Sequence, residues 1–171
     1  MEQVKWFDRK FVFPSEQSIF PAVIERLLGT PLRLTDKINR IPNDRWTVKH
    51  TNSWSIQENV GHLVDLEPLW QGRLDDILGG AKYLRPTDLE NKKTDNAHHN
   101  EEEMDALLTQ FQQLRETTID RLQSLSEDDI YKHARHPRLE SPMRTMDLFL
   151  FVAEHDDHHL ARISELNRKL A

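Results

Sequence analysis

The stretch from Thr145 to Lys169 is the feature that most limits what this chain can fold into. It contains no Gly or Pro and is rich in residues that favour helices, which predicts one uninterrupted helix capped by Thr145. Its apolar residues recur at helical spacing and therefore share one face; they include Leu148, Val152, Ile163 and Leu166.

Two histidines, His155 and His159, lie four residues apart on that same face, because positions i and i+4 sit one above the other on a helix. Neutral imidazole is a preferred ligand for Zn, Ni, Cu or Fe. Such a pair supplies two of the three protein ligands that a catalytic metal site needs. The pattern therefore predicts a metal site that requires a third ligand from elsewhere in the chain.

The rest of the chain favours an all-α fold, since Gly is scarce (5 residues) and strand-type alternation is hard to find. Ser55 and Glu58 form a capping box, which predicts a second helix that ends at Gly79. A third helix is expected over 101–125. The first, starting at Ser15, is expected to break at 29–31, where Gly, Thr and Pro follow one another. We predict a single four-helix-bundle domain over 1–171, with an N-terminal arm over 1–14 whose aromatic residues anchor it.

Composition narrows the classes of partner. With 171 residues, 37% apolar and 30% charged, the chain has the make-up of a globular protein. A net charge of −6 argues against nucleic acid and against an anionic membrane as partner, and no apolar run approaches the roughly 20 residues of a membrane span. The N-terminus lacks the layout of a secretory signal, so a cytoplasmic location is expected. Because there is no Cys, histidines, carboxylates and water must hold any metal.

Among nine histidines, His62 best fits as the third ligand, because it lies on the apolar face of the second helix with Leu63 and Leu66. Both assignments have a plainer alternative. His62 could be a hydrogen-bonded histidine of the core, and His155 and His159 could be a pair on a solvent-exposed face. No HExxH motif is present. His158 is expected beside the site or at an interface, and surface positions are expected for the remaining histidines: His50, His98, His99, His133 and His136.

Two segments carry a resemblance to a known family. Residues 54–67 form a helix start led by Trp with a His inside it, and residues 154–163 contain His-x3-His. Together with Arg115 and the His136-Pro137 pair, they resemble the DinB-like superfamily over roughly residues 15–168. The resemblance implies a four-helix bundle that binds a divalent ion, zinc or nickel in most members, and it implies homodimers. By position, the resemblance assigns the metal ligands as His62, His155 and His159.

The same resemblance implies a metal-dependent thiol S-transferase, which adds a low-molecular-weight thiol to an electrophilic substrate. Metal-dependent hydrolysis at the same site is the first alternative, and a non-catalytic module stabilised by the metal is the second. A carboxylate is expected to orient one imidazole, with Asp65 and Glu67 preferred over Glu58, Asp156 and Asp157. The segments 85–99 and 131–144 are expected to line the substrate entrance.

Overall fold

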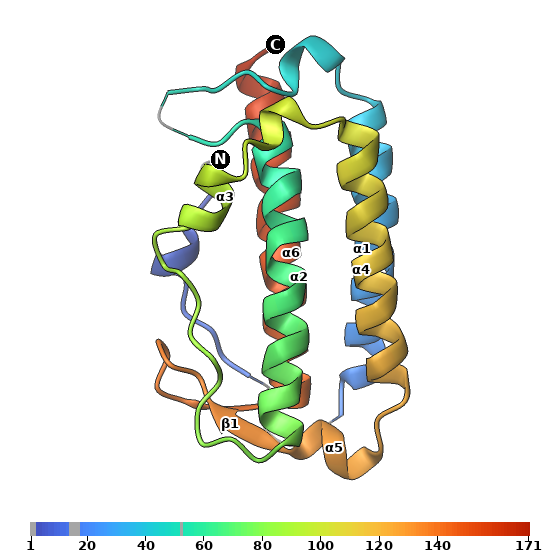
Figure 1. Ribbon diagram of the computed structural model, residues 1–171, viewed down its shortest axis with the longest axis vertical. Coiled ribbons are helices and arrows are strands. Elements are labelled where there is room, and N and C mark those ends of the chain that lie inside the picture. Colours follow the sequence, from blue (N-terminus) through green and yellow to red (C-terminus); the bar gives the residue numbers. More distant parts are fainter. Residues whose placement is uncertain (1–2, 14–17, 52) are drawn as a thin grey trace.

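The computed structural model describes residues 3–13, 18–51 and 53–171. Its four long helices are α1 (Phe20–Asn39), α2 (Ile56–Leu78), α4 (Met104–Gln123) and α6 (Thr145–Lys169) (Figure 1). Both α1 and α2 pack against α4 and α6, so α1 and α2 lie diagonally opposite although they follow one another in the chain. The expected all-α four-helix bundle is confirmed.

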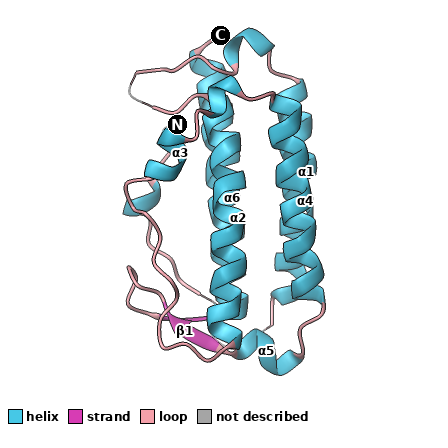
Figure 2. Cartoon of the chain, viewed as in Figure 1, coloured by secondary structure: helices cyan, strands magenta, loops and turns pink. Residues whose placement is uncertain are grey.

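The shorter elements are η1 (Trp6–Asp8), η2 (Asn43–Arg45), α3 (Lys92–Asn96), η3 (His99–Glu101), α5 (Glu127–Tyr131), β1 (His133–Arg135) and β2 (Pro142–Arg144). The strands pair antiparallel, with Ala134 opposite Met143, and were not expected from the sequence. Figure 2 shows that this hairpin, α3 and the N-terminal segment lie beside the α2–α6 pair, away from α1 and α4. They form a partial second layer over one side of the bundle.

The expected break in the first helix is wrong, because α1 continues through Pro31. A proline inside a helix removes the hydrogen bond to the carbonyl four residues earlier, here that of Leu27. Nη1 of Arg115, on α4, donates to that carbonyl at 3.4 Å. The Leu27 carbonyl, which Pro31 leaves without a backbone donor, therefore accepts a hydrogen bond from a side chain of a neighbouring helix. The predicted cap at Ser15 falls outside the described residues.

The predicted start of α2 is confirmed. Ser55 Oγ accepts from the Glu58 N–H at 3.0 Å, and Glu58 Oε2 accepts from the Ser55 N–H at 2.8 Å. The helix ends before Gly79, as expected. The last helix begins at Thr145, but its cap is Arg144, whose N–H donates to Asp147 Oδ2 at 3.0 Å.

Arg115 is a fully buried charged residue of the bundle and is 1% exposed. Its guanidinium donates to Glu67 Oε1 of α2 at 2.6 Å and to Asp156 Oδ2 of α6 at 2.6 Å. With the contact to Leu27 of α1, this one side chain links all four long helices. Leucine, isoleucine and phenylalanine side chains make up most of the surrounding core.

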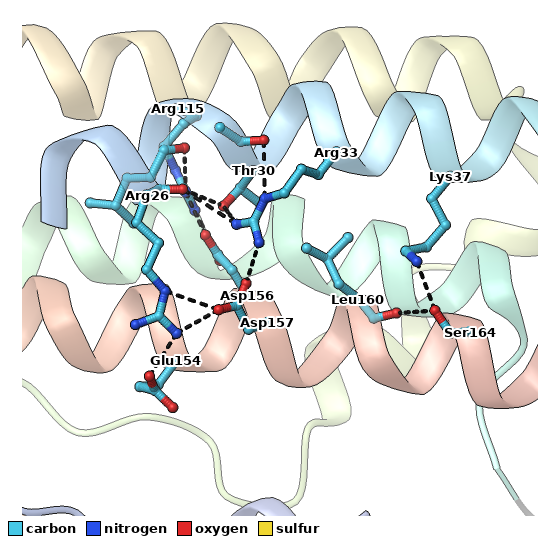
Figure 3. A network of polar contacts seen from close by, with 12 residues as sticks. Arg26, Thr30, Arg33, Lys37, Arg115, Glu154, Asp156, Asp157, Leu160 and Ser164 are labelled. Atoms are coloured by element: carbon cyan, nitrogen blue, oxygen red, sulfur yellow. Dashed lines mark hydrogen bonds and ion pairs between the residues drawn. The ribbon is translucent and has the colours of Figure 1, made fainter. Parts of the chain in front are cut away.

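A second group of ion pairs joins α1 to α6 nearer the surface (Figure 3). Arg26 Nε donates to Asp157 Oδ2 at 2.9 Å and its Nη2 to Glu154 Oε1 at 2.6 Å, while Arg33 Nη1 donates to Asp157 Oδ1 at 2.7 Å. Arg9 of the N-terminal segment also pairs with Glu154. Part-exposed pairs of this kind contribute little stability singly, and they chiefly fix how α1 and the arm lie against α6. No described helix combines the length and the apolar character needed to cross a membrane.

Replacing Arg115 by Met is expected to lower the free energy of unfolding by about 3–5 kcal/mol, because two buried carboxylates lose their partner. Urea unfolding of Arg115→Met measures the loss. The control is the triple variant Glu67→Leu, Arg115→Met, Asp156→Leu, which removes the whole charged group and should recover most of the stability. A single variant as stable as the wild type would contradict the role of Arg115 in holding the helices together.

Candidate metal centre

Three buried histidines meet beside α2 and α6. His62 comes from α2, and His155 and His159 come from successive turns of α6; their exposed fractions are 4%, 4% and 6%. One ligand nitrogen from each lies within 4.8 Å of the other two, and within the described ranges no further His, Asp or Glu joins this group. The structure thus brings together the three residues that the sequence singled out. They face a cavity at the side of the bundle.

Hydrogen bonds at Nδ1 fix the ring orientation of two of these histidines. Asn59 donates through Nδ2 to the Ser55 carbonyl at 2.7 Å, which leaves its Oδ1 to accept from Nδ1 of His159 at 2.9 Å. Thr94 Oγ1 donates to Asp65 Oδ2 at 2.8 Å and so accepts from Nδ1 of His62 at 2.9 Å. With the proton on Nδ1, the Nε2 lone pair of each ring remains free for a metal.

Asp65 is the centre of this supporting network. The same Oδ2 that accepts from Thr94 also accepts from Nε2 of His99 at 2.9 Å. His99 is 6% exposed, so its expected surface position is wrong. Its ring fits because Gly61 has no side chain: a Cβ at Gly61 would lie 2.2 Å from His99 Cγ. The preference for Asp65 as an orienting carboxylate agrees with this geometry, acting through Thr94.

Glu67 does not support the histidines. Its Oε1 accepts from Arg115, and its Oε2 accepts from Thr118 Oγ1 at 2.7 Å. Asp156 likewise pairs with Arg115, Asp157 faces α1, and Glu58 completes the cap of α2. These four carboxylates serve the bundle, and the expectation for Glu67 is therefore wrong.

The arrangement of His155 fits a bound cation. Its Nε2 lies 3.2 Å from Nε2 of His159, and its Nδ1 has no hydrogen-bond partner among the described residues. Tetrahedral zinc with N ligands at about 2.0–2.1 Å would place ligand nitrogens roughly 3.3 Å apart. The His155–His159 pair already has this spacing, and a ligand nitrogen of His62 lies within 4.8 Å of both.

Burial keeps all three imidazoles neutral. Loss of hydration lowers the pKa of His62 to about 4 and lowers the pKa values of His155 and His159 well below the ordinary range. Neighbouring histidines act in the same direction for each. Neutral imidazole is the form that binds metals, so the site is held in its ligating state at neutral pH.

The histidines form one wall of a cavity of about 220 Å³. Its other walls come from the N-terminal segment, from α2 and α6, and from the three connections that join the long helices, and none of its lining residues belongs to α1 or α4. The rings of Trp54 and His62 lie 4.6 Å apart between centroids and are tilted by 42°, and Trp6 meets the ring of His155 edge-on at 5.0 Å. Trp6 of the N-terminal segment thus contacts one of the three histidines directly.

Both connections that were expected to line an entrance contribute to this cavity. Residues 87–89 and Asn91 come from the first, and His136 and Arg138 come from the second. His136 is 3% exposed, so its expected surface position is also wrong. His158, which is half-buried, lines the cavity beside the three histidines, as expected for a residue next to the site.

A sequence model described as the DinB superfamily matches residues 26–163. The chain belongs to the DinB superfamily. The match includes all three histidines and most of the bundle, and it bears out the resemblance drawn from the two motifs. With the buried histidine group, membership suggests a divalent metal ion.

Two solved structures of DinB-like fold resemble the chain. YfiT from Bacillus subtilis, described as a probable metal-dependent hydrolase with an unusual four-helix bundle topology, shares 21% identity at a TM-score of 0.78, with 92% of this chain and 93% of YfiT covered. The colibactin self-resistance protein ClbS, solved in complex with a dsDNA, shares 14% at a TM-score of 0.66, with 87% and 95% covered. A search among curated proteins finds no match.

The exclusion of nucleic acid as a partner is contradicted by the ClbS complex, since a protein of this fold is found with dsDNA. The physical reason is that net charge is a sum over the whole chain and does not describe a local surface. The predicted thiol and electrophile gain no support from either neighbour.

Thr94→Val is expected to weaken metal binding about 10–100-fold, because Nδ1 of His62 loses its acceptor and the link to Asp65. Competition with a chromogenic chelator measures the affinity. Thr94→Ser should restore it, and Thr117→Val, at an exposed threonine of α4, should leave it unchanged. Equal affinities for Thr94→Val and wild type would show that this hydrogen bond has no part in ligation.

Stability of the metal-free protein is expected to fall as pH drops from about 6.5 to about 4. Folding holds the pKa values of His62 and His136 at about 4, whereas the unfolded chain protonates histidine near 6.5. The unfolded state therefore binds more protons in this window, and stability decreases by up to about 1.4 kcal/mol per pH unit for each such histidine. Above this window the contribution is constant.

Urea unfolding between pH 7.5 and pH 5 tests this dependence. His136→Asn keeps an acceptor near the position of Nδ1 and should reduce the slope by about one proton. A stability that stays constant down to pH 5 would contradict the burial of neutral imidazoles.

Proposed function

We propose that this protein is a metal-dependent hydrolase whose divalent ion is bound by His62, His155 and His159. The observation that carries the proposal is the meeting of three buried, neutral imidazoles at the wall of a cavity, with no fourth protein ligand in the described part of the chain. Three ligands and open positions are typical of catalytic sites, whereas structural sites have four. The description of YfiT as a probable metal-dependent hydrolase supports the same class of reaction.

A divalent ion held there supplies Lewis-acid activation of water and of the substrate's electrophilic group, and zinc or nickel both suit three imidazoles. The protein's own residues prepare the site for it. Asn59 and Thr94 hold two rings with Nε2 forward. Trp6, Trp54 and Trp70 line the cavity and exclude bulk water, which strengthens electrostatic interactions inside it.

The size of the cavity favours hydrolysis over thiol transfer. About 220 Å³ is below the roughly 300–1,000 Å³ of pockets for one drug-sized ligand, and transfer requires room for a thiol and an electrophile together. Hydrolysis requires one organic substrate and a water. Asp88 is the acidic residue among the lining side chains, and its carboxylate accepts the N–H groups of Glu90 and Lys92 at 3.0 and 2.6 Å. The carboxylate of Asp88 is therefore engaged by the backbone, and a divalent ion held by the three histidines would supply the activation of water.

The test is metal analysis of untagged protein followed by assays with activated esters, amides and phosphoesters. We expect one metal ion per chain, hydrolysis that a chelator abolishes and zinc or nickel restores, and loss of both metal and activity in His159→Ala. His133→Ala, at an exposed histidine of β1, is the matched control and should retain both. Products that contain an added thiol, with no hydrolysis of any ester or amide, would overturn the assignment.

A further inference from the structure

Arg73 of α2 is a buried cation without an anionic partner. It is 1% exposed and lines the cavity. Its Nε donates to the Arg85 carbonyl at 3.1 Å, its Nη2 has no hydrogen-bond partner, and no described carboxylate forms an ion pair with it. Burial lowers the pKa of this guanidinium to about 10. Burying a charge without a partner is costly, so a position of this kind is expected to have a function.

His136 presents a second donor at the same place. Its Nδ1 accepts the backbone N–H groups of Arg138 and Leu139, both at 3.2 Å, which fixes the proton of the neutral ring on Nε2. That Nε2 lies 3.3 Å from Nη1 of Arg73. Two N–H donors therefore meet without an acceptor between them. An anionic oxygen placed beside them would accept from both.

Arg138 adds a third cationic or donor group on the same wall. Its guanidinium lies over the ring of Phe7, with 5.2 Å from Cζ to the ring centroid, and within the described ranges it forms no ion pair with a carboxylate. Burial lowers its pKa as well. The nearby acidic residue Asp88 is already occupied by backbone N–H groups. The carboxylate whose charge acts on Arg73 is that of Asp76, and it is already paired with Arg85 at 2.8 Å. Within the described residues, neither Arg73 nor Arg138 therefore has a carboxylate of its own at this end of the cavity.

Aromatic side chains lie between these groups and the three candidate metal ligands. The ring of Trp70 lies 5.4 Å from Arg73 Cζ and 5.7 Å from the ring of His155. Phe151 contacts His136 at 5.5 Å and Trp6 at 5.0 Å, between ring centroids. A ligand that fills the cavity thus meets cations at one end, aromatic rings in the middle and the three imidazoles at the other.

We propose that Arg73, His136 and Arg138 form a subsite for an anionic oxygen group, a carboxylate or a phosphate, at one end of a small substrate with an apolar middle. The placement of the reacting group near His62, His155 and His159 rests on the proposed hydrolase function; the anion subsite itself does not.

The test uses full-length, metal-reconstituted protein titrated with phenylacetate, phenylphosphonate and the neutral phenylacetamide in a calorimeter. At least one anion should bind ten-fold or more tightly than the amide, and the preferred anion distinguishes carboxylate from phosphate. Arg73→Met should lower anion affinity at least ten-fold without lowering the melting temperature, since it removes an unpaired buried charge. Arg138→Gln, at a half-buried residue, should lower affinity several-fold, which keeps the test valid if Arg73→Met does not fold.

Two controls distinguish an anion held at this subsite from an anion held by the metal or by surface charge. Arg40→Gln makes the same charge change at the exposed residue that follows α1, which is paired with Asp36, and should leave anion affinity unchanged. His159→Ala should lose the metal but keep Arg73-dependent anion binding. That result, even in a protein without any hydrolase activity, would support the subsite and contradict only the proposed function. Anion binding that disappears in His159→Ala and is unaffected by Arg73→Met and Arg138→Gln would place the anion on the metal and overturn the subsite.

Discussion

The bundle depends on the buried guanidinium of Arg115. From α4 it reaches Glu67 on α2, Asp156 on α6 and the Leu27 carbonyl on α1. An apolar core alone tolerates small shifts of one helix along another, whereas directional charge-assisted hydrogen bonds do not. Asp156 directly follows His155, so the bonds that fix the register of α6 also fix where the imidazoles meet. The metal centre is thus positioned by a network on the opposite flank of the same helices.

The cavity contains polar groups whose burial works against folding. Three neutral imidazoles, the unpartnered Nδ1 of His155 and the unpartnered Nη2 of Arg73 all lie away from water. Groups of this kind lower stability unless something pairs with them. Elsewhere in the bundle the buried charges are paired, as Arg115 is. Unsatisfied groups gathered in one cavity therefore point to ligands, a cation at one end and an anion at the other.

Local signals predicted the parts of this structure that depend on local physics. The capping box at Ser55 and the long uninterrupted pattern of α6 gave correct helices, and helical spacing brought out His155 and His159. The failures were non-local. Pro31 does not break α1 because Arg115, far along the chain, replaces the missing donor. His99 and His136 lie in polar connections, where local sequence predicts exposure. His99 is buried because its ring fits against Gly61, and His136 is buried beside Arg73 of α2.

The cavity lies at the side of the four-helix bundle, so the residues that line it are largely different from those that hold the bundle together. Helices α2 and α6 supply the three histidines and part of the cavity wall, while the N-terminal segment and the connections between the helices supply the remaining walls. Those segments can change in sequence without disturbing the Arg115 network, because they pack on a different flank. Proteins at 21% and 14% identity can therefore keep one fold while differing in what they bind. For the same reason the net charge of −6, a property of the whole surface, describes poorly a cavity whose far end is cationic.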